Sequence, residues 1–185
     1  MKLVAETIAA LGAPEFMRTM GEESSPSAVI ARWHHSGAEI DIGAPDTVRV
    51  AMSLQTGQHV CVPTGKAVGR ANIKVGSVSV MPACERTKVV IRGQADILQI
   101  FLRETFLDAA VEGQFACLAL LNSHDSELQA AAMQLFVAAT RGDPDDSLLL
   151  ESGARRIAAR VLDRGEPQPP GPARGGLARN CAQGV

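Results

Sequence analysis

The sequence predicts a mainly β member of the α+β class, an antiparallel barrel or sandwich with helices at both ends. From residue 28 to residue 102, apolar and polar residues alternate in short runs that are separated by Gly or Pro. A period of two gives each strand one buried and one exposed face. Before and after this region, apolar residues recur with the period of a helix. Short strands at close spacing, with turn residues at the corners, are typical of an antiparallel barrel or sandwich.

A helix is expected at the start of the chain. Leu3, Val4, Ile8 and Leu11 share one helical face, and Gly12 follows them as a stop signal. Strands are then expected at 28–33, 38–42, 47–54, 58–62, 71–75, 77–81, 88–92 and 96–102.

The segment 74–84, KVGSVSVMPAC, carries the strand pattern most clearly. Val78 and Val80 fall on one face and the serines between them on the other, so one side of this strand is expected to be buried. Pro82 ends the strand, because it has no N–H to donate to a neighbouring strand.

Helices are expected again after residue 102. A short helix is predicted at 103–111, and a longer one begins at Asp125 or Ser126 and ends at Gly142. A third helix begins at 143–146, where acidic residues suit the first turn. The last two helices are expected to form an antiparallel hairpin.

Composition and charge exclude several classes of function. The chain has one Trp, five Phe and no Tyr, and its formal net charge is −2, so we expect no direct binding of DNA or RNA by this chain. No apolar run approaches the ~18 residues of a membrane helix, so no membrane association is expected. The four cysteines lack the C-x-x-C spacing and no signal sequence is evident, which favours a cytoplasmic protein. High Ala, Arg, Gly and Val content would suit a bacterium with a GC-rich genome.

The sequence offers little for catalysis or for a metal. The histidines at 34, 35, 59 and 124 include no His-x-His pair, and neighbours on a strand such as His34 and His35 point to opposite faces. Cys84 has no histidine near it in the sequence, and no nucleophile-elbow or phosphate-loop motif occurs. We therefore expect no catalytic residue, no metal and no cofactor, and a protein that is not an enzyme.

Several segments together resemble a known family: Ala28–His34 (AVIARWH), Val48–Leu54, Gly76–Ala83 (GSVSVMPA), Ile97–Leu102 and the helices that run to Leu162. They resemble the N-terminal part of AraC-type transcription regulators, over roughly residues 1–177. The resemblance implies a cupin-like antiparallel β-barrel or jelly roll with an N-terminal helix and a C-terminal helical hairpin. Cys84 departs from the family, which often has glycine there.

The resemblance implies three segments: a helix and effector-binding barrel at 1–112, a helical dimerisation segment at 113–164, and a linker and tail at 165–185. The linker begins with GEPQPPGPARGG, in which Gly and Pro predominate. GGLA at 175–178 is similar to the beginning of the family's helix-turn-helix domain. The chain then ends in RNCAQGV, so the expectation is a regulator truncated before its DNA-binding domain.

A small-molecule effector of unknown identity is the partner that the resemblance implies for the barrel. A small barrel can enclose one such ligand between apolar walls and a few polar groups. The alternative is that the candidates are ordinary core and rim residues. The residues expected to line the site are Trp33, His35, Arg49, Met52 and Gln99.

The resemblance also implies a homodimer formed through the helices after the barrel. The last helix carries an apolar stripe that could form this interface, made of Leu150, Ala154, Ile157 and Val161. The alternative is a helix that docks on its own barrel. Two other functions stay open: a stand-alone cupin enzyme of the metal-dependent isomerase or dioxygenase class, and a degenerate gene product.

Overall fold

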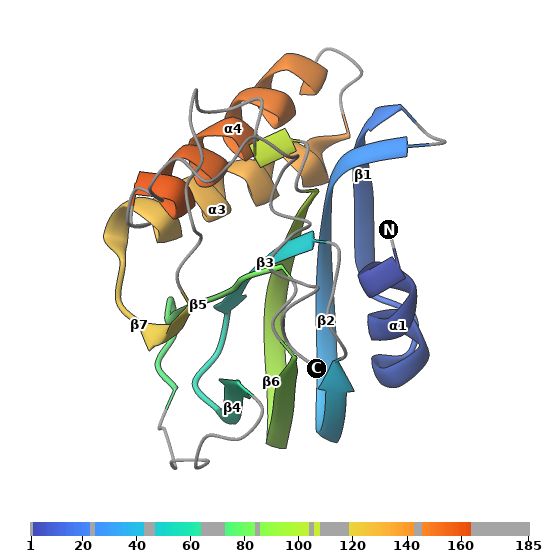
Figure 1. Cartoon of the computed structure of the whole chain (residues 1–185), viewed down its shortest axis with the longest axis vertical. Helices are drawn as coiled ribbons and strands as arrows, with labels where there is room; N and C mark the ends of the chain where they lie inside the picture. Colours follow the sequence, from blue (N-terminus) through green and yellow to red (C-terminus); the bar gives the residue numbers. More distant parts are fainter. Residues whose placement is uncertain are drawn as a thin grey trace, which may run out of the picture.

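The structure, a computed structural model, describes residues 2–22, 25–42, 47–63, 73–83, 86–103, 106–107, 119–142 and 146–163 (Figure 1). The linker and tail predicted at 165–185, and the boundary predicted between 112 and 113, lie outside these residues. The elements are α1 (Lys2–Leu11), β1 (Phe16–Glu22), β2 (Ser25–Ile42), β3 (Thr47–Ser53), β4 (Gln58–Pro63), β5 (Val78–Met81), β6 (Thr87–Arg103), β7 (Leu120–Ser123), α3 (Ser126–Arg141) and α4 (Ser147–Asp163).

The strands form one antiparallel sheet in the order β1-β2-β6-β3-β5-β7, and β4 pairs with β6. The first half of β2 pairs with the second half of β6, which also pairs with β3. The second half of β2 pairs with the first half of β6, which also pairs with β4. The two long strands therefore connect the part of the sheet that contains β3 with the part that contains β4.

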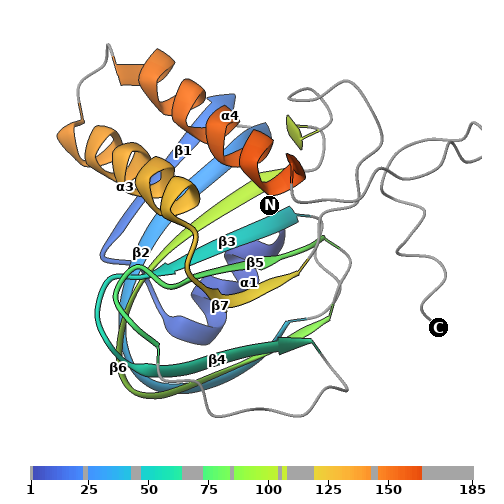
Figure 2. The ribbon, with the colours of Figure 1, turned by 90° about the vertical axis from the view of Figure 1, so that its left-hand side faces the viewer.

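Bends in the two long strands curl the sheet. The pairing shifts between Ser36 and Ala38, where Gly37 has a φ of 70°, and Gly93 in β6 has a φ of 73°. Glycine adopts this left-handed conformation readily because it has no Cβ, and such irregularities bend a strand. In Figure 2 the two long strands curve round so that β4 lies opposite β3 and β5, and β4 contacts β7. The strands predicted separately at 28–33 and 38–42 are thus two halves of one bent strand, as are those at 88–92 and 96–102.

The curled sheet does not close into a complete barrel. Among the described residues, the edge strands β1 and β7 do not pair with each other. On the side of β2, α1 packs Leu3 and Val4 into the concave side of the sheet. Side chains of a helix therefore cover part of this side of the sheet.

Two strands were not predicted, and one predicted strand and one predicted helix differ. Of the strand predicted at 71–75, Ile73 forms only an isolated bridge with Gly57 and 74–75 are not strand, whereas 71–72 lie outside the described residues. β1 is mostly solvent-exposed, so its sequence FMRTMGE has no clear apolar alternation. β7 has four half-buried residues, too few for a periodic signal. Of the helix predicted at 103–111, Arg103 belongs to β6 and 106–107 are helical, whereas 108–111 lie outside the described residues.

The convex, outer face of the sheet packs against α3 and α4 in one large apolar cluster. From the sheet this outer cluster takes Met20, Ala28, Ile30, Val48, Val50, Met52, Val78, Val80, Leu98, Ile100 and Leu102, and from the helices Leu128, Ala131, Ala132, Leu135, Ala139, Leu150, Ala154, Ile157, Ala158, Val161 and Leu162, together with Leu107. The helical hairpin and the sheet therefore share one core.

The hairpin begins and ends as its sequence predicts. Asp125 caps α3, because its Oδ1 accepts a hydrogen bond from the backbone N–H of Leu128 at 3.0 Å. Gly142 ends the helix in the left-handed conformation, with a φ of 73°. No helix among the described residues is long and apolar enough to span a membrane.

Arg32 ties the sheet to α3 at the rim of the outer cluster. Its Nε and Nη2 donate to the two carboxylate oxygens of Asp96 at 2.9 Å and 2.6 Å, and its guanidinium lies 6.0 Å from the centre of the Phe136 ring. The hydrogen bonds to Asp96 raise the pKa of Arg32 above its ordinary value. This two-point pair fixes β2 against β6 beside the residues that face the concavity.

Candidate functional site

The concave, inner face of the sheet holds a second apolar cluster. Residues from both halves of the bent strands meet in it, which shows that the curl brings them to one interior. Its members are Leu3, Val4, Val29, Ala31, Trp33, Ile40, Ala51, Met81, Val89, Ile91, Ala95, Ile97 and Phe101.

Trp33, His35, Arg49 and Gln99, four of the five residues predicted to bind the effector, lie on this inner face. Trp33 is a member of the inner cluster, and His35 follows two residues later along β2. Arg49 and Gln99 alternate with outer-cluster residues on β3 and β6, so both point inward. The structure thus brings these four residues to one side of the sheet.

Met52 lies on the other face. It is buried in the outer cluster, next to α3 and α4, together with Val48 and Val50 of the same strand. The period of two along β3 places it there, opposite to Arg49 and Ala51. The sequence showed this alternation but not which of the two faces is concave.

Gln99 lies between small residues on the inner face. It pairs across the sheet with Ala31 on one side and with Ala51 on the other, and Ala51 in turn pairs with Ser79. Side chains that lie directly opposite on neighbouring strands have Cβ atoms about 4.5–5.5 Å apart. Small side chains therefore flank the Gln99 amide on both sides.

Aromatic and aliphatic side chains enclose this row of small residues. The rings of Trp33 and Phe101 meet edge to face with their centres 6.1 Å apart. Trp33 is held in place because its Nε1–H donates to the carbonyl oxygen of Gly12 at 3.2 Å, at the end of α1. Ile97 pairs with Trp33 next to the Gln99 row. The inner face is thus apolar apart from a few polar side chains.

The polar side chains of this face differ in whether they have hydrogen-bond partners within the chain. Ser79 Oγ accepts a hydrogen bond from the Asn122 N–H at 2.9 Å and donates to Asn122 Oδ1 at 3.3 Å. Arg49 is 2% exposed, donates to Met81 Sδ and has a further partner within the chain. Gln99 is 5% exposed, and its Oε1 has no hydrogen-bond partner within the part of the chain that the structure describes. His35 Nε2 is likewise buried without one.

No metal centre is found in the described part of the chain. Its His, Cys, Asp and Glu side chains form no group of three or more that could hold an ion. His34 is exposed and His35 is half-buried on the opposite face of β2, as expected for neighbours on a strand. Cys84 lies outside the described residues, so the structure says nothing of its surroundings.

The apolar stripe of α4 faces the sheet and not the solvent, which corrects its prediction as an exposed dimerisation surface. Leu150, Ala154, Ile157 and Val161 are all buried in the outer cluster, and Ile157 has no exposed surface. The second possibility, a helix docked on its own sheet, is therefore what the structure shows. These four residues are not accessible to a partner.

The exposed side of the α3–α4 hairpin carries a different apolar surface. Val137 is 43% exposed and Leu149 is 60% exposed, and both border a groove of about 450 Å³ between the helices. We call this surface the hairpin groove. The spacing of Met133 and Val137, on a second face of α3, was the signal in the sequence that could have revealed it. Its lining residues are Met133, Gln134, Leu135, Val137, Ala138, Arg141, Leu149, Ser152, Gly153 and Arg156.

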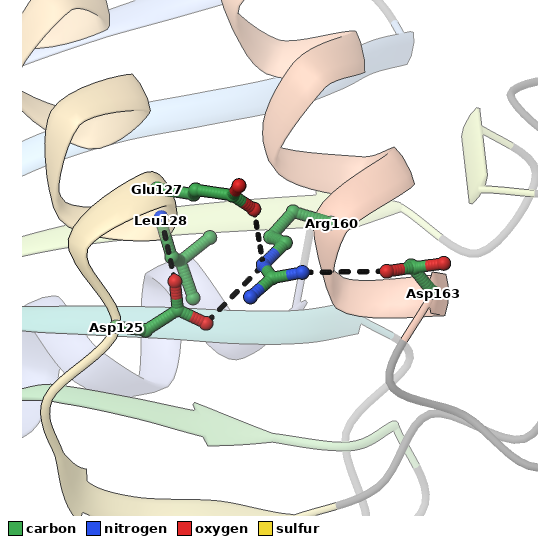
Figure 3. Close-up of polar contacts among 5 residues, drawn as sticks. All are labelled: Asp125, Glu127, Leu128, Arg160 and Asp163. Atoms are coloured by element: carbon green, nitrogen blue, oxygen red, sulfur yellow. Dashed lines mark hydrogen bonds and ion pairs between the residues drawn. The ribbon is translucent and has the colours of Figure 1, made fainter.

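A cluster of charged side chains fixes the far end of the hairpin (Figure 3). Arg160 of α4 donates from Nε to Asp125 Oδ2 at 3.3 Å and lies 3.1 Å from Glu127. Its Nη1 also contacts Asp163 at 3.3 Å. Asp125 therefore both caps α3 and binds α4, which links the start of α3 to the end of α4.

Comparison with known proteins reveals similarity in structure but not in sequence. No protein-family model matches the chain, and no curated protein matches its sequence. Among solved structures, apo ToxT from Vibrio cholerae, an AraC-family protein, matches 80% of this chain and 58% of its own length, with a TM-score of 0.54 and 10% identity. A cupin-2 domain protein from Shewanella frigidimarina matches 54% of this chain and 92% of its own length, with a TM-score of 0.37 and 15% identity.

The topology and the likeness to ToxT confirm the predicted fold class. The chain is a mainly antiparallel sheet with an N-terminal helix and two C-terminal helices. A match to ToxT over 80% of the chain must also extend past Ser123, because residues 1–123 make up only about two thirds of the chain. The similarity in fold is therefore not confined to the sheet.

Proposed function

We propose that this chain is the sensor and dimerisation part of an AraC-type transcription regulator. In this proposal it binds a small molecule in the concavity of the sheet, catalyses no reaction and acts in the cytoplasm. The observation that carries the proposal is the likeness to ToxT, which covers 80% of the chain and so extends beyond the curled sheet. Reading of DNA is assigned to a helix-turn-helix domain outside this chain.

The inner face supports the ligand-binding half of the proposal. A ligand site needs apolar walls with a small number of placed polar groups. Trp33, Phe101 and Ile97 supply such walls, and Gln99 supplies an amide that forms no bond through its oxygen within the described residues.

A screen of small molecules tests ligand binding. Trp33 is the only tryptophan in the chain, so its emission reports on the inner face alone. We expect at least one compound to raise the melting temperature and to change the Trp33 emission together. A metal analysis of the same sample tests the rival cupin enzyme: stoichiometric bound metal would favour that rival.

The hairpin groove supports the dimerisation half of the proposal. Of the large apolar residues that are exposed in the described part of the chain, Met133, Val137, Leu148 and Leu149 lie on α3 and α4. Exposed apolar patches of this kind are typical of interaction surfaces. The partner proposed is a second copy of this chain, since an isologous contact needs only one such patch.

Charge substitutions in the hairpin groove test the dimer. The double variant Val137→Glu, Leu149→Glu is expected to convert a dimer to a monomer in light scattering, because two carboxylates per subunit would enter an apolar interface. Both positions are exposed within the chain, so the fold should be retained. Val75→Glu is the matched control, because Val75 is also an exposed apolar residue but lies between β4 and β5. A double variant that stays dimeric would place the interface elsewhere.

A further inference from the structure

We infer that two copies of the chain dock with their α3 helices antiparallel, so that Glu127 of each copy lies beside Arg141 of the other. This inference rests on the proposed dimerisation function, and it adds how the second copy is oriented on the hairpin groove. The order of the exposed side chains along α3 carries it.

One exposed face of α3 carries five residues that are three or four positions apart. They are Glu127, Ala130, Gln134, Val137 and Arg141, and all of them are exposed. Residues at this spacing lie in one row along a helix, and we call this row the α3 stripe. Its last three members also line the hairpin groove, so a second copy that enters the groove meets the stripe.

The α3 stripe is complementary to itself when its direction is reversed. Gln134 is the middle residue, and a two-fold axis at this residue reverses the order of the stripe in the second copy. Glu127 then lies opposite Arg141, and Ala130 lies next to Val137, a small side chain beside a branched one. The two Gln134 amides face each other, and each can donate and accept a hydrogen bond. Each position of the stripe therefore meets a side chain of suitable charge, size or polarity.

The charges at the two ends of the stripe can both contact a partner. The Glu127 side chain is 71% exposed, and it lies 3.1 Å from Arg160 of its own chain. Arg141 is exposed and contacts no carboxylate in the described part of the chain. An exposed ion pair contributes little to stability, so Glu127 loses little when it also meets an arginine of the second copy.

A parallel docking of the two helices would instead bring like charges together. Glu127 would lie beside Glu127 of the second copy, and Arg141 beside Arg141, and such contacts disfavour an interface. Arg156 donates to Gln134 Oε1 at 2.7 Å. It therefore lies near the middle of the stripe in either orientation and does not decide between them. The charges at the ends of the stripe favour the antiparallel dimer.

Charge reversal at the two ends of the stripe tests this orientation. Glu127→Arg and Arg141→Glu should each raise the dissociation constant of the dimer at least about tenfold, because each turns two attractive contacts into repulsive ones. An equimolar mixture of the two variants should dimerise as tightly as the wild-type chain, since both contacts of the mixed dimer again join opposite charges. Analytical ultracentrifugation measures the dissociation constants.

The matched control is Glu151→Arg. Glu151 is also an exposed carboxylate that pairs with an arginine of its own helix, Arg155, but it lies on α4 and outside the α3 stripe. This substitution should leave the dissociation constant unchanged.

A cysteine at the middle of the stripe gives a second measurement. Gln134→Cys should form a disulfide-linked dimer under mild oxidation, because its Cα atom and that of the second copy lie near the axis, within the about 4.4–6.8 Å that a disulfide spans. Thr140→Cys, at an exposed position of the same helix outside the stripe, should give no more cross-linked dimer than the wild-type chain. Cross-linking at Thr140 and not at Gln134 would overturn the inference.

The other outcomes separate this inference from the proposed dimer. Charge reversals without effect, or a mixture as weak as its two components, would overturn the antiparallel docking. If Val137→Glu, Leu149→Glu still dissociates the dimer, the proposed dimerisation stands without it. A wild-type chain that stays monomeric at every concentration would overturn both.

Discussion

The two faces of the curled sheet are made by alternate residues of the same strands, yet they differ in character. On the outer face Val48, Val50, Leu98 and Ile100 meet α3 and α4, and every member of the cluster is apolar. On the inner face Gln99 interrupts the apolar surface and keeps an unsatisfied oxygen. The outer face therefore provides stability, whereas the inner face contains a buried amide oxygen without a partner among the described residues, which costs stability.

The strongest test of this contrast is a charge in the outer cluster. Ile157→Glu should destabilise the fold by at least about 4 kcal/mol, because it buries an unpaired carboxylate where the isoleucine has no exposed surface. Thermal unfolding followed by circular dichroism measures the change. Ala159→Glu, at an exposed position of the same helix, should leave the melting temperature nearly unchanged. A folded, monomeric Ile157→Glu variant would contradict the assignment of this residue to the core.

Substitutions of Asp125, at the charged end of the hairpin, should lower the free energy of unfolding by less than Ile157→Glu does. Asp125→Ala removes the cap of α3 and the contact with Arg160 together, and we expect a loss of about 2 kcal/mol. Asp125→Asn keeps an oxygen for the Leu128 N–H but loses the charge facing Arg160, so its loss should stay below about 1 kcal/mol. Urea unfolding of both variants separates the cap from the ion pair. Equal losses would mean that the charge, and not the cap, holds this end of the hairpin.

The smallest expected change in stability is a gain and not a loss. Gln99→Leu should stabilise the chain in the absence of ligand by about 1 kcal/mol, because an apolar side chain of similar size replaces a buried amide whose oxygen has no partner. The same substitution at Gln94 should be neutral. A clear loss of stability in Gln99→Leu would show that the amide is part of the structure and would remove the contrast between the two faces.

Local signals in the sequence determined the elements. The alternation from residue 28 to 102 predicted the β class, and the stop and cap signals at Gly12, Asp125 and Gly142 lie where the structure has helix ends. Such signals depend on a few neighbouring residues, so they can be read without the fold. The period of two also places Gln99 on the opposite face of its strand from Leu98 and Ile100.

Only the tertiary structure decided what each face meets. The stripe of Leu150 and Ile157 on α4 reads equally well as an interface or as a core, and it became core because α4 lies on the sheet. Met52 was predicted to face the ligand site, but it lies in the outer cluster. The period of two shows which residues share a face, but it does not show which face becomes concave. The curl itself depends on bends near Gly37 and Gly93 and on pairing between residues far apart in the sequence. Long-range pairing of this kind fixes the concavity, and no local pattern encodes it.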